Sequence, residues 1–326
     1  MVDLRRLHML RVVHQQGTVT AAAEALHLTP SGVSRHIREL ARELKVPLLE
    51  PQGRNIRLTP AGYLLIEHAD VLLARWEQAQ AELESHRAGM SRPLRVAGFT
   101  TAVSGLIAPA AGQLRNSHPD FQVHVRECDT MQSMDLLVAG EVDLAVVEPI
   151  EGGPPPDDAR FEQIPLLEEP FIMLVPAAHP LAQASTVQLA DAAAEDWIVA
   201  EPGTCDHAQR VRGLCAAAGF SPRIVHSATH WPAVWSLVSN GLGVSLIPQL
   251  AEGPAGQAVV RVPVSSENMP MRRILTCVRR GSRRNPLIDL GVQALKDAVH
   301  DHQPLDDEPT SSRQLTCSPG ATPKSS

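Results

Sequence analysis

The sequence lacks an apolar run long enough to cross a membrane, and its first residues, Met1 to Arg6, show no signal for secretion. They carry neither a long apolar segment nor a cleavage site made of small residues. We therefore expect a protein that contacts no membrane and remains in the cytoplasm. A solute-binding protein of a transporter would need export, so the sequence disfavours that class.

Cysteine is scarce and scattered along the chain. The five cysteines are Cys128, Cys205, Cys215, Cys277 and Cys317, and no two of them form a Cys-x-x-Cys pair. Their odd number and their spacing argue against a disulfide scaffold and against a zinc site. The chain has 14 histidines, but no i,i+4 pair has a third ligand in reach. We expect neither a bound metal nor a cofactor.

Positive charge is also in short supply, because the formal net charge is −7 at pH 7. A negative net charge is unfavourable for nucleic-acid binding, but the charge is distributed unevenly between the N-terminal part and the rest of the chain. Residues 1–58 hold nine Lys or Arg against five Asp or Glu, so they carry +4 and the remainder carries −11. A basic N-terminal part can neutralise phosphates locally, while the acidic body is repelled by them and orients the molecule.

The N-terminal part contains a pattern typical of two short helices joined by a tight turn, between Thr18 and Arg42. Thr29 can cap the second helix, and Pro30 fits its first position. Apolar residues at a 4-3-4 spacing form one buried stripe: Val33, Ile37, Leu40 and Leu44. The opposite side carries Ser31, Arg35, Arg38 and Arg42. The pattern predicts a helix-turn-helix, although a helical hairpin with a solvated charged face remains the plainer interpretation.

A turn between two short alternating arms follows at residues 51–58. Arg54 and Arg57 lie near its tip. The segment is a candidate wing that reaches phosphates or a minor groove beside the second helix.

A long helix is predicted from Thr59 and Pro60, which repeat the start signal of Thr29, to about Gly89. Its apolar residues recur at steps of four and three: Ala61, Leu65, Ala69, Leu72, Trp76, Ala79 and Leu83. About thirty residues at ~1.5 Å each make a rod of roughly 45 Å, which a small head domain cannot cover. We expect its seam to pair with a second copy of the chain; burial on its own C-terminal domain is the alternative.

Beyond Pro93 the pattern changes to alternating strands and helices, which imply a parallel sheet with helices on its faces. A first unit covers Leu94 to Val147, and a second covers Phe171 to Ile247. In the second unit we expect a helix near residues 187–193. After about His300 the chain is rich in Pro, Ser, Thr and Asp without an apolar period, which predicts disorder.

The chain resembles the LysR-type transcriptional regulators. The matching segments are residues 4–17, the helix pair, 33–37, 46–49 and 58–62. The family usually has Gln-Pro-Ala where this chain has Pro30-Ser31-Gly32, so base preference does not carry over. The resemblance implies an α/β architecture with a winged helix-turn-helix (1–59), a linker helix for dimerisation (60–90) and a two-lobed, periplasmic-binding-protein-like effector domain (91–300). Its lobe I would comprise 91–165 and 268–300, and its lobe II 166–267, with a disordered tail at 301–326.

The resemblance implies a DNA-binding transcriptional regulator, not an enzyme, that responds to a small-molecule effector. It implies a homodimer or homotetramer on an interrupted inverted repeat of double-stranded DNA, with RNA polymerase as a further partner. Ser34 and Arg35 match family positions that hold the DNA backbone, and Ser31 and Arg38 are candidates for contacts nearer the bases. The full set of expected DNA-binding residues is Thr29, Pro30, Ser31, Ser34, Arg35, Arg38, Arg54 and Arg57.

For the effector, polar segments that follow strands and precede helices are the expected ligands, at residues 98–101, 201–204 and 227–230. Thr100, Thr101 and Thr204 match family positions in the cleft between the lobes; Thr130 and His230 match less closely. Taken singly, each threonine is better explained as a helix cap, and only the convergence of the three segments on one cleft favours the binding role. The hypothesis is a small hydrogen-bonding effector, with anions among the candidates.

A second hypothesis concerns two cysteines. Peroxide-sensing members of the family carry a reactive cysteine near the position of Cys205, and Cys215 lies where a resolving partner would. Residues ten apart on one helix are about 15 Å distant by its rise. A disulfide needs about 4.4–6.8 Å between α-carbons, so it would require local unwinding. Cys205, Asp206 and His207 also contain the residue types of a catalytic set, but sequence neighbours point in different directions.

Overall fold

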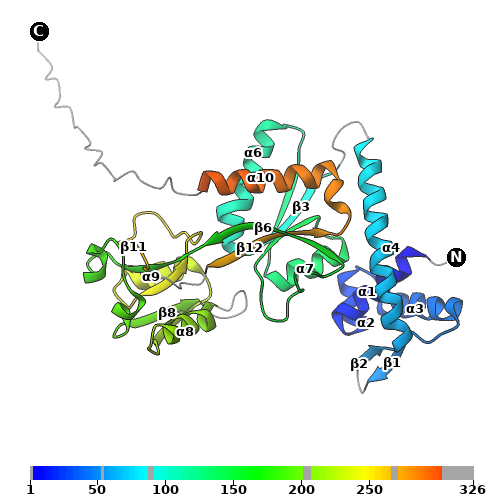
Figure 1. Cartoon of the computed structure of the whole chain (residues 1–326), viewed down its shortest axis with the longest axis horizontal. Coiled ribbons are helices and arrows are strands. Elements are labelled where there is room, and N and C mark those ends of the chain that lie inside the picture. Colours follow the sequence, from blue (N-terminus) through cyan, green and yellow to red (C-terminus); the bar gives the residue numbers. More distant parts are fainter. Residues whose placement is uncertain (1–2, 53–54, 87–91, 201–206, 266–270, 303–326) are drawn as a thin grey trace, which may run out of the picture.

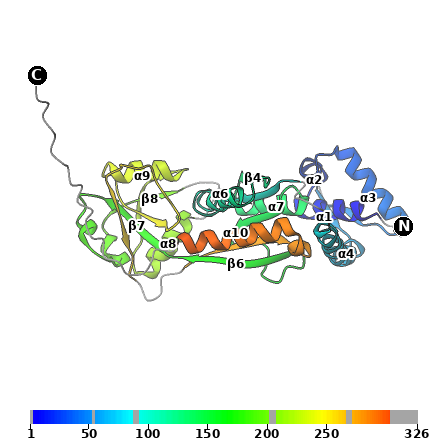
Figure 2. The same cartoon turned by 90° about the horizontal axis from the view of Figure 1, so that it is seen from above.

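The structure is a computed structural model that describes residues 3–52, 55–86, 92–200, 207–265 and 271–302 (Figure 1). The N-terminal helices and the strand pair β1-β2 lie at one end of the molecule, a five-stranded sheet lies in the middle, and the sheets β10-β7-β11 and β8-β9 lie at the other end (Figures 1 and 2). Among the described helices, none combines the length and the apolar character needed to cross a membrane.

The head consists of α1 (Leu4–Gln16), α2 (Val19–Ala25), α3 (Pro30–Leu44) and the antiparallel strands β1 (Leu49–Gln52) and β2 (Asn55–Leu58). Local sequence sets these boundaries. Asp3 caps α1, which ends at Gly17 with a φ of 69°, and Thr18 caps α2. The stripe predicted for α3 is confirmed, since Val33, Ile37 and Leu40 are at most 3% exposed.

Helix α4 (Pro60–Ser85) leaves the head and runs beside the effector domain (Figure 1). The Thr59 hydroxyl accepts a hydrogen bond from the Gly62 amide at 3.1 Å, which fixes the start of the helix. One side packs inside the same chain, where Ile66, Ala69, Leu73 and Ala81 are buried. The other side stays exposed and apolar, with Tyr63, Leu64, Val71, Leu72, Trp76 and Leu83. Helix α4 therefore has both surfaces that the sequence left as alternatives, and the predicted stripe is divided between them: Leu72, Trp76 and Leu83 are exposed, whereas Ala69 is buried in the same chain.

The central sheet has the strand order β4-β3-β5-β12-β6. Its strands are β3 (Leu94–Gly98), β4 (Val123–Glu127), β5 (Leu144–Val147), β6 (Phe161–Glu169) and β12 (Arg272–Arg279). Strand β3 is parallel to β4 and β5, but β12 is antiparallel to β5 and β6. The parallel arrangement predicted for the first unit, residues 94–147, is therefore confirmed, and β12 and β6 extend the sheet by antiparallel pairing.

Helices surround this sheet. They are α5 (Thr100–Ala102), which continues through a π-helical turn η1 (Val103–Ile107) into α6 (Ala108–Ser117), then α7 (Thr130–Ala139), the short η4 (Ser282–Arg284) and α10 (Pro286–His302). Asp129 caps α7, and Gly140 ends it with a φ of 77°.

The second lobe contains β7 (Phe171–Pro176), β8 (Asp196–Ala200), β9 (Arg223–Ala228), β10 (Ser245–Pro248) and β11 (Val259–Pro263), with α8 (His207–Ala217) and α9 (Trp231–Ser239). Strands β8 and β9 are parallel, whereas β7 is antiparallel to β10 and β11. The short 3-10 helices η2 (Pro180–Gln183) and η3 (Leu189–Ala192) complete the lobe. The helix expected near residues 187–193 is thus only the single turn η3.

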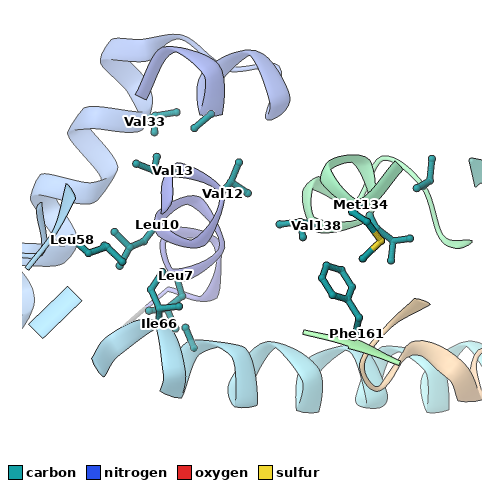
Figure 3. Packing of buried hydrophobic residues seen from close by; sticks show 14 of the residues in the cluster. Leu7, Leu10, Val12, Val13, Val33, Leu58, Ile66, Met134, Val138 and Phe161 are labelled. Atoms are coloured by element: carbon teal, nitrogen blue, oxygen red, sulfur yellow. The ribbon is translucent and has the colours of Figure 1, made fainter. Parts of the chain in front are cut away.

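The head packs on the lobe that contains the central sheet, and the contact is made through α7. One hydrophobic cluster contains Leu10 and Val12 of α1 together with Val138 of α7 and Phe161 of β6. Figure 3 shows Val12 and Val138 pointing toward one another across this contact. Around it, the Arg160 guanidinium donates to the Gln15 amide oxygen at 3.1 Å. This packing brings the DNA-binding candidates and the effector domain into one body.

Candidate nucleic-acid interface and effector cleft

Helix α3 is held with its polar face outward. The Thr29 hydroxyl accepts a hydrogen bond from the Gly32 amide at 3.1 Å, and Pro30 occupies the first helical position. The helix ends at Lys45, which adopts a left-handed φ of 58° and donates its amide to the carbonyls of Ala41 and Arg42. A lysine therefore takes the conformation that glycine usually provides, and the helix end is intact.

The exposed side of α3 carries Ser31, Arg35, Arg38 and Arg42. Arg38 lies along the helix, because its Nε donates to the Ser34 carbonyl at 3.2 Å. Within the described residues, Arg35 and Arg42 form no ion pair and are available to anions. The face combines hydroxyl donors with guanidinium groups, which suits phosphate oxygens and base edges.

The candidate wing forms beside α3. Strands β1 and β2 pair from Leu49 opposite Leu58 to Gln52 opposite Asn55. Arg54 lies outside the described residues. Arg57 is exposed, and its Nε lies 2.6 Å from a Glu50 carboxylate oxygen. That exposed pair costs little to separate, so Arg57 can exchange Glu50 for a phosphate.

A cleft opens between the lobes and has a volume of about 470 Å³ including its mouth. Its walls come from β3 and α5, the ends of β5 and β10, and the starts of β7, α8, α9 and β12. They contain Phe99, Thr100, Thr101, Glu148, Phe171, His207, Arg210, Trp231, Pro248 and Arg272. Three aromatic rings, Phe99, Phe171 and Trp231, thus meet in a chain that is only 3% aromatic.

The sequence-predicted effector residues fall in different places. Thr100 and Thr101 line the cleft. Thr130 is buried behind its wall, where its hydroxyl accepts a hydrogen bond from the Glu148 amide at 3.3 Å. His230 is exposed directly before α9, and its neighbour Trp231 is the residue that lines the cleft. Thr204 lies outside the described residues.

Arg272 is the polar centre of the cleft and is 6% exposed. Its Nε lies 2.9 Å from a Glu148 carboxylate oxygen, and its Nη1 lies 3.4 Å from one of Glu169. Its Nη2 donates to the Thr101 hydroxyl at 3.1 Å, and its guanidinium stacks 4.5 Å above the Phe99 ring centre. These contacts join β3, β5 and the strands that cross between the lobes.

The carboxylates of the cleft balance its cations. Glu169 accepts a hydrogen bond from the Leu250 amide at 2.6 Å. Burial raises the pKa of Glu169, which the nearby Arg272 partly opposes. Arg210 of α8 lies 3.9 Å from Glu148. Arg210 and Arg272 therefore share Glu148 in the lining, Glu169 is buried beside Arg272, and two threonines, three aromatic rings, His207 and Pro248 form the rest of the described lining.

His207 holds the start of α8 against the neighbouring strands. Its Nδ1 accepts a hydrogen bond from the Ala200 amide at 3.0 Å, and its Nε2 donates to the Leu246 carbonyl at 2.6 Å. Burial lowers its pKa to about 4, so the ring is neutral at pH 7. Its edge-to-face contact with Trp231, 5.1 Å between ring centres, orients one wall of the cleft.

Burial raises the thiol pKa of each described cysteine, including the partly buried Cys128. Cys215 is fully buried in α8, and burial raises its pKa to about 12. Burial likewise raises the pKa of Cys277 to about 12. Because the thiolate is the reactive form, neither residue is activated in this conformation. Cys205 and Cys317 lie outside the described residues.

Sequence reasoning missed most of the cleft lining. Glu148 had a usable signal, because a charged residue directly follows the buried strand Leu144–Val147. Trp231 had a weaker signal at the start of an apolar helix. Arg272 had none, since it meets Glu148 only through a strand that returns 124 positions later in the chain.

Comparison with known proteins agrees with this geometry. Residues 4–63 match the family "Bacterial regulatory helix-turn-helix protein, lysR family", and residues 87–300 match the "LysR substrate binding domain". The DNA-binding transcriptional dual regulator OxyR of Escherichia coli (strain K12) is 26% identical over 303 residues, covering 92% of this chain and 97% of that protein. A hydrogen peroxide-inducible genes activator of Dickeya chrysanthemi is 28% identical over 306 residues, covering 93% and 97%.

Solved structures show the same fold. A full-length OxyR variant from Pseudomonas aeruginosa has a TM-score of 0.63 and 23% identity, covering 91% of this chain and 95% of that one. The two family matches together span nearly all of the described chain. The chain therefore belongs to the LysR family and is a DNA-binding regulator that carries an effector-binding domain.

Proposed function

We propose that α3 enters the major groove of DNA, with Ser34 and Arg35 on the backbone and Ser31 and Arg38 toward the bases. The observation that carries this proposal is the division of α3 into a buried apolar stripe and an exposed face of guanidinium groups. Thr29 and Pro30 at the helix start, and Arg54 and Arg57 of the wing, would contact neighbouring phosphates. A regulator with this role works beside the chromosome, so we place it in the cytoplasm.

The test is DNA binding measured across a series of salt concentrations with Arg35→Ala. Loss of one phosphate contact should lower the affinity and reduce the salt slope by about one unit. Arg115→Ala on α6 is the matched control, because Arg115 is also an exposed arginine but lies on the effector domain. Unchanged affinity and slope for Arg35→Ala would contradict this docking.

Pairing of two chains through the exposed side of α4 would deliver two recognition helices to one DNA. Successive major grooves lie about 34 Å apart, so the binding site should be an interrupted inverted repeat. Two such dimers would form a tetramer. RNA polymerase is a further partner that a DNA-bound regulator of this kind would meet at a promoter.

The inter-lobe cleft is the proposed effector site. Its carboxylates already balance its cations, and three aromatic rings form its walls, so it suits a small ligand with both polar and planar groups. Because the lining of the cleft comes from both lobes, a ligand bound there would change how the lobes close. A coupling of about 1–3 kcal/mol between cleft and DNA would make a useful switch.

The effector site is tested with Thr100→Val combined with Thr204→Val. The response of DNA binding to the effector should be lost, while DNA affinity without effector stays at the wild-type value. An unchanged response would remove both threonines from the site.

Thiol-based redox sensing is the second candidate function, favoured by the similarity to hydrogen peroxide-inducible genes activators. Cys205 would be the reactive thiol and Cys215 its partner. The burial of Cys215 and its pKa of about 12 require α8 to unwind first. Thiol titration after mild peroxide, with DNA binding followed in parallel, tests this function. Redox sensing predicts that peroxide changes the DNA binding of the wild type and that Cys205→Ser abolishes this change. A wild-type protein whose DNA binding does not respond to peroxide would exclude redox sensing.

A further inference from the structure

A second cavity lies where the head, α4 and the effector domain meet. It has a volume of about 870 Å³ including its mouth and is separate from the inter-lobe cleft. Helix α1 contributes one wall, α4 a second, and the end of α7 with the ends of β6 and β12 a third. Its polar lining is dominated by arginines, namely Arg5, Arg11, Arg160, Arg279 and Arg280. We call this space the junction cavity.

The positive charge of the junction cavity is only partly compensated. Asp70 lies 3.6 Å from Arg11, Glu77 lies 2.6 Å from Arg279, and Asp158 lies 2.8 Å from Arg160. The 3.6 Å distance to Asp70 exceeds the ~2.7–2.9 Å of a good charge-assisted hydrogen bond.

Arg5 and Arg280 supply the surplus charge. Among the described residues, Arg280 donates to the backbone carbonyls of residues 158, 159 and 161 and has no carboxylate within ion-pair distance. Within the described part of the chain, the Arg5 guanidinium has no carboxylate partner. Asp143 lies 3.6 Å from Arg279 but is shared with Arg92 and Arg95, so five guanidinium groups face four carboxylates, one of them shared.

The neighbouring groups respond to this surplus. Burial, and to a smaller extent the charges of Arg11 and Arg279, lower the pKa of His8 to about 4. The pKa of Arg11 is also lowered, first by burial and then by Arg279 and Arg160, against the pull of Asp70. His8 stays neutral and accepts a hydrogen bond on Nδ1 from Arg11 at 3.1 Å. The cavity therefore disfavours a further cation and favours an anion.

We propose that the junction cavity binds a small, multiply charged oxyanion of the phosphate class. Guanidinium groups match phosphate oxygens in pairs, and here they come from three different elements. Arg5 and Arg280 contribute the unmatched charges, and Arg11 supplies a buried cation at the base. The bound anion touches α1 of the head and β12 of the effector domain at once, so it holds the head in its packed position.

The experiment titrates the full-length protein with inorganic phosphate and with pyrophosphate, in buffer free of other oxyanions. Sodium chloride of equal ionic strength is the reference. The melting temperature should rise to saturation with either oxyanion and more steeply with pyrophosphate. The pKa of His8, followed by NMR, should rise on binding because an anion offsets the field of the arginines. If the oxyanions raised the melting temperature no more than sodium chloride does, the effect would be one of ionic strength only, and the proposal would be overturned.

Two variants locate the site. Arg5→Gln removes a side chain without an ion pair and should weaken pyrophosphate binding about tenfold without changing the melting temperature in chloride. Arg280→Gln should weaken pyrophosphate binding at least as much. This variant also loses the hydrogen bonds from Arg280 to the carbonyls of residues 158, 159 and 161. The matched control is Arg115→Gln on α6, which should bind as the wild type does. Wild-type affinity in Arg5→Gln and Arg280→Gln would place any anion elsewhere and contradict the proposal.

Phosphate groups also occur in DNA, so a third arm separates the two sources. DNA affinity is measured for Arg5→Gln in buffer without free phosphate. Unchanged DNA affinity assigns the site to a free oxyanion. A loss of DNA affinity together with no pyrophosphate effect in the wild type would show that the arginines serve the DNA backbone, and would overturn the small-ligand site.

Discussion

One buried carboxylate, that of Asp143, holds the start of the effector domain against the central sheet. Asp143 is fully buried directly before β5 and accepts hydrogen bonds from Arg92 and Arg95, which immediately follow the linker. Burial alone would raise the pKa of Asp143, but the hydrogen bonds from Arg95 and Arg92 outweigh burial and lower it. The carboxylate therefore ties the first strand to the sheet and stays ionised.

Replacing Asp143 by Asn should lower the free energy of unfolding by about 3 kcal/mol at neutral pH, because it leaves buried donors without their charge partner. The pKa of Asp143 is lowered in the folded state, so its contribution is fully present above the ordinary carboxyl pKa and is lost as pH falls from that value through the lower folded pKa. Denaturant unfolding at several pH values measures this. Glu168→Gln is the control, since its pair with Arg273 is about 60% exposed and should cost less than about 1 kcal/mol. Equal losses in both variants would contradict the account.

His207 makes the stability of the fold depend on pH. Its folded pKa is about 4, against about 6.5 for an ordinary histidine, so between these values the unfolded chain takes up a proton that the folded chain does not. Stability should therefore fall as pH drops from 6.5 to 4, by about 3 kcal/mol from this residue. His207→Gln should flatten that part of the curve. A wild-type slope in His207→Gln would show that another group is responsible.

At the scale of elements, α3 and β6 show what sequence can and cannot predict. Thr29, Pro30 and the spacing of Val33, Ile37 and Leu40 specify α3 locally, so its boundaries could be predicted. Strand β6 contains Pro165 and several glutamates, which argue against a strand. It forms because it is the edge strand of its sheet, and a register shift opposite Ile274 and Leu275 accommodates Pro165. That edge position depends on β12, which sequence periodicity alone does not place.

The lining of the cleft shows the same contrast between residues specified by local sequence and residues placed by distant contacts. Thr100 and Thr101 could be proposed because they follow a strand, whereas Arg272 and Glu169 depend on how the chain crosses between the lobes. Sequence therefore located one wall of the cleft and missed its charged centre.

Helix α4 gives a prediction at the element scale. Leu72 is 50% exposed on a face without neighbours in the described chain, so Leu72→Glu should leave the fold intact. The same substitution should dissociate the proposed dimer, because the new carboxylate would have to give up its hydration when the two α4 helices pair. Sedimentation analysis of the purified protein measures this. Leu242→Glu, at a position 44% exposed outside α4, should keep the wild-type assembly. A dimeric Leu72→Glu protein would place the seam elsewhere.

At the scale of the whole molecule, α7 connects the cleft to the head. Its first residue, Thr130, bonds the backbone of Glu148 behind the cleft wall. Farther along, Asp135 accepts a hydrogen bond from Gln15, and Val138 packs in the same cluster as Val12 of α1. A change at the cleft that moves Glu148 therefore reaches the head through a single packed helix.

The central claim is that two copies of α3 are presented to one DNA by paired α4 helices. Footprinting of the wild-type protein on DNA from upstream of its own gene tests it most directly. The account predicts two protected segments on one face, with centres about one helical turn or a whole number of turns apart. A single protected segment, or no preference over random duplex, would contradict it.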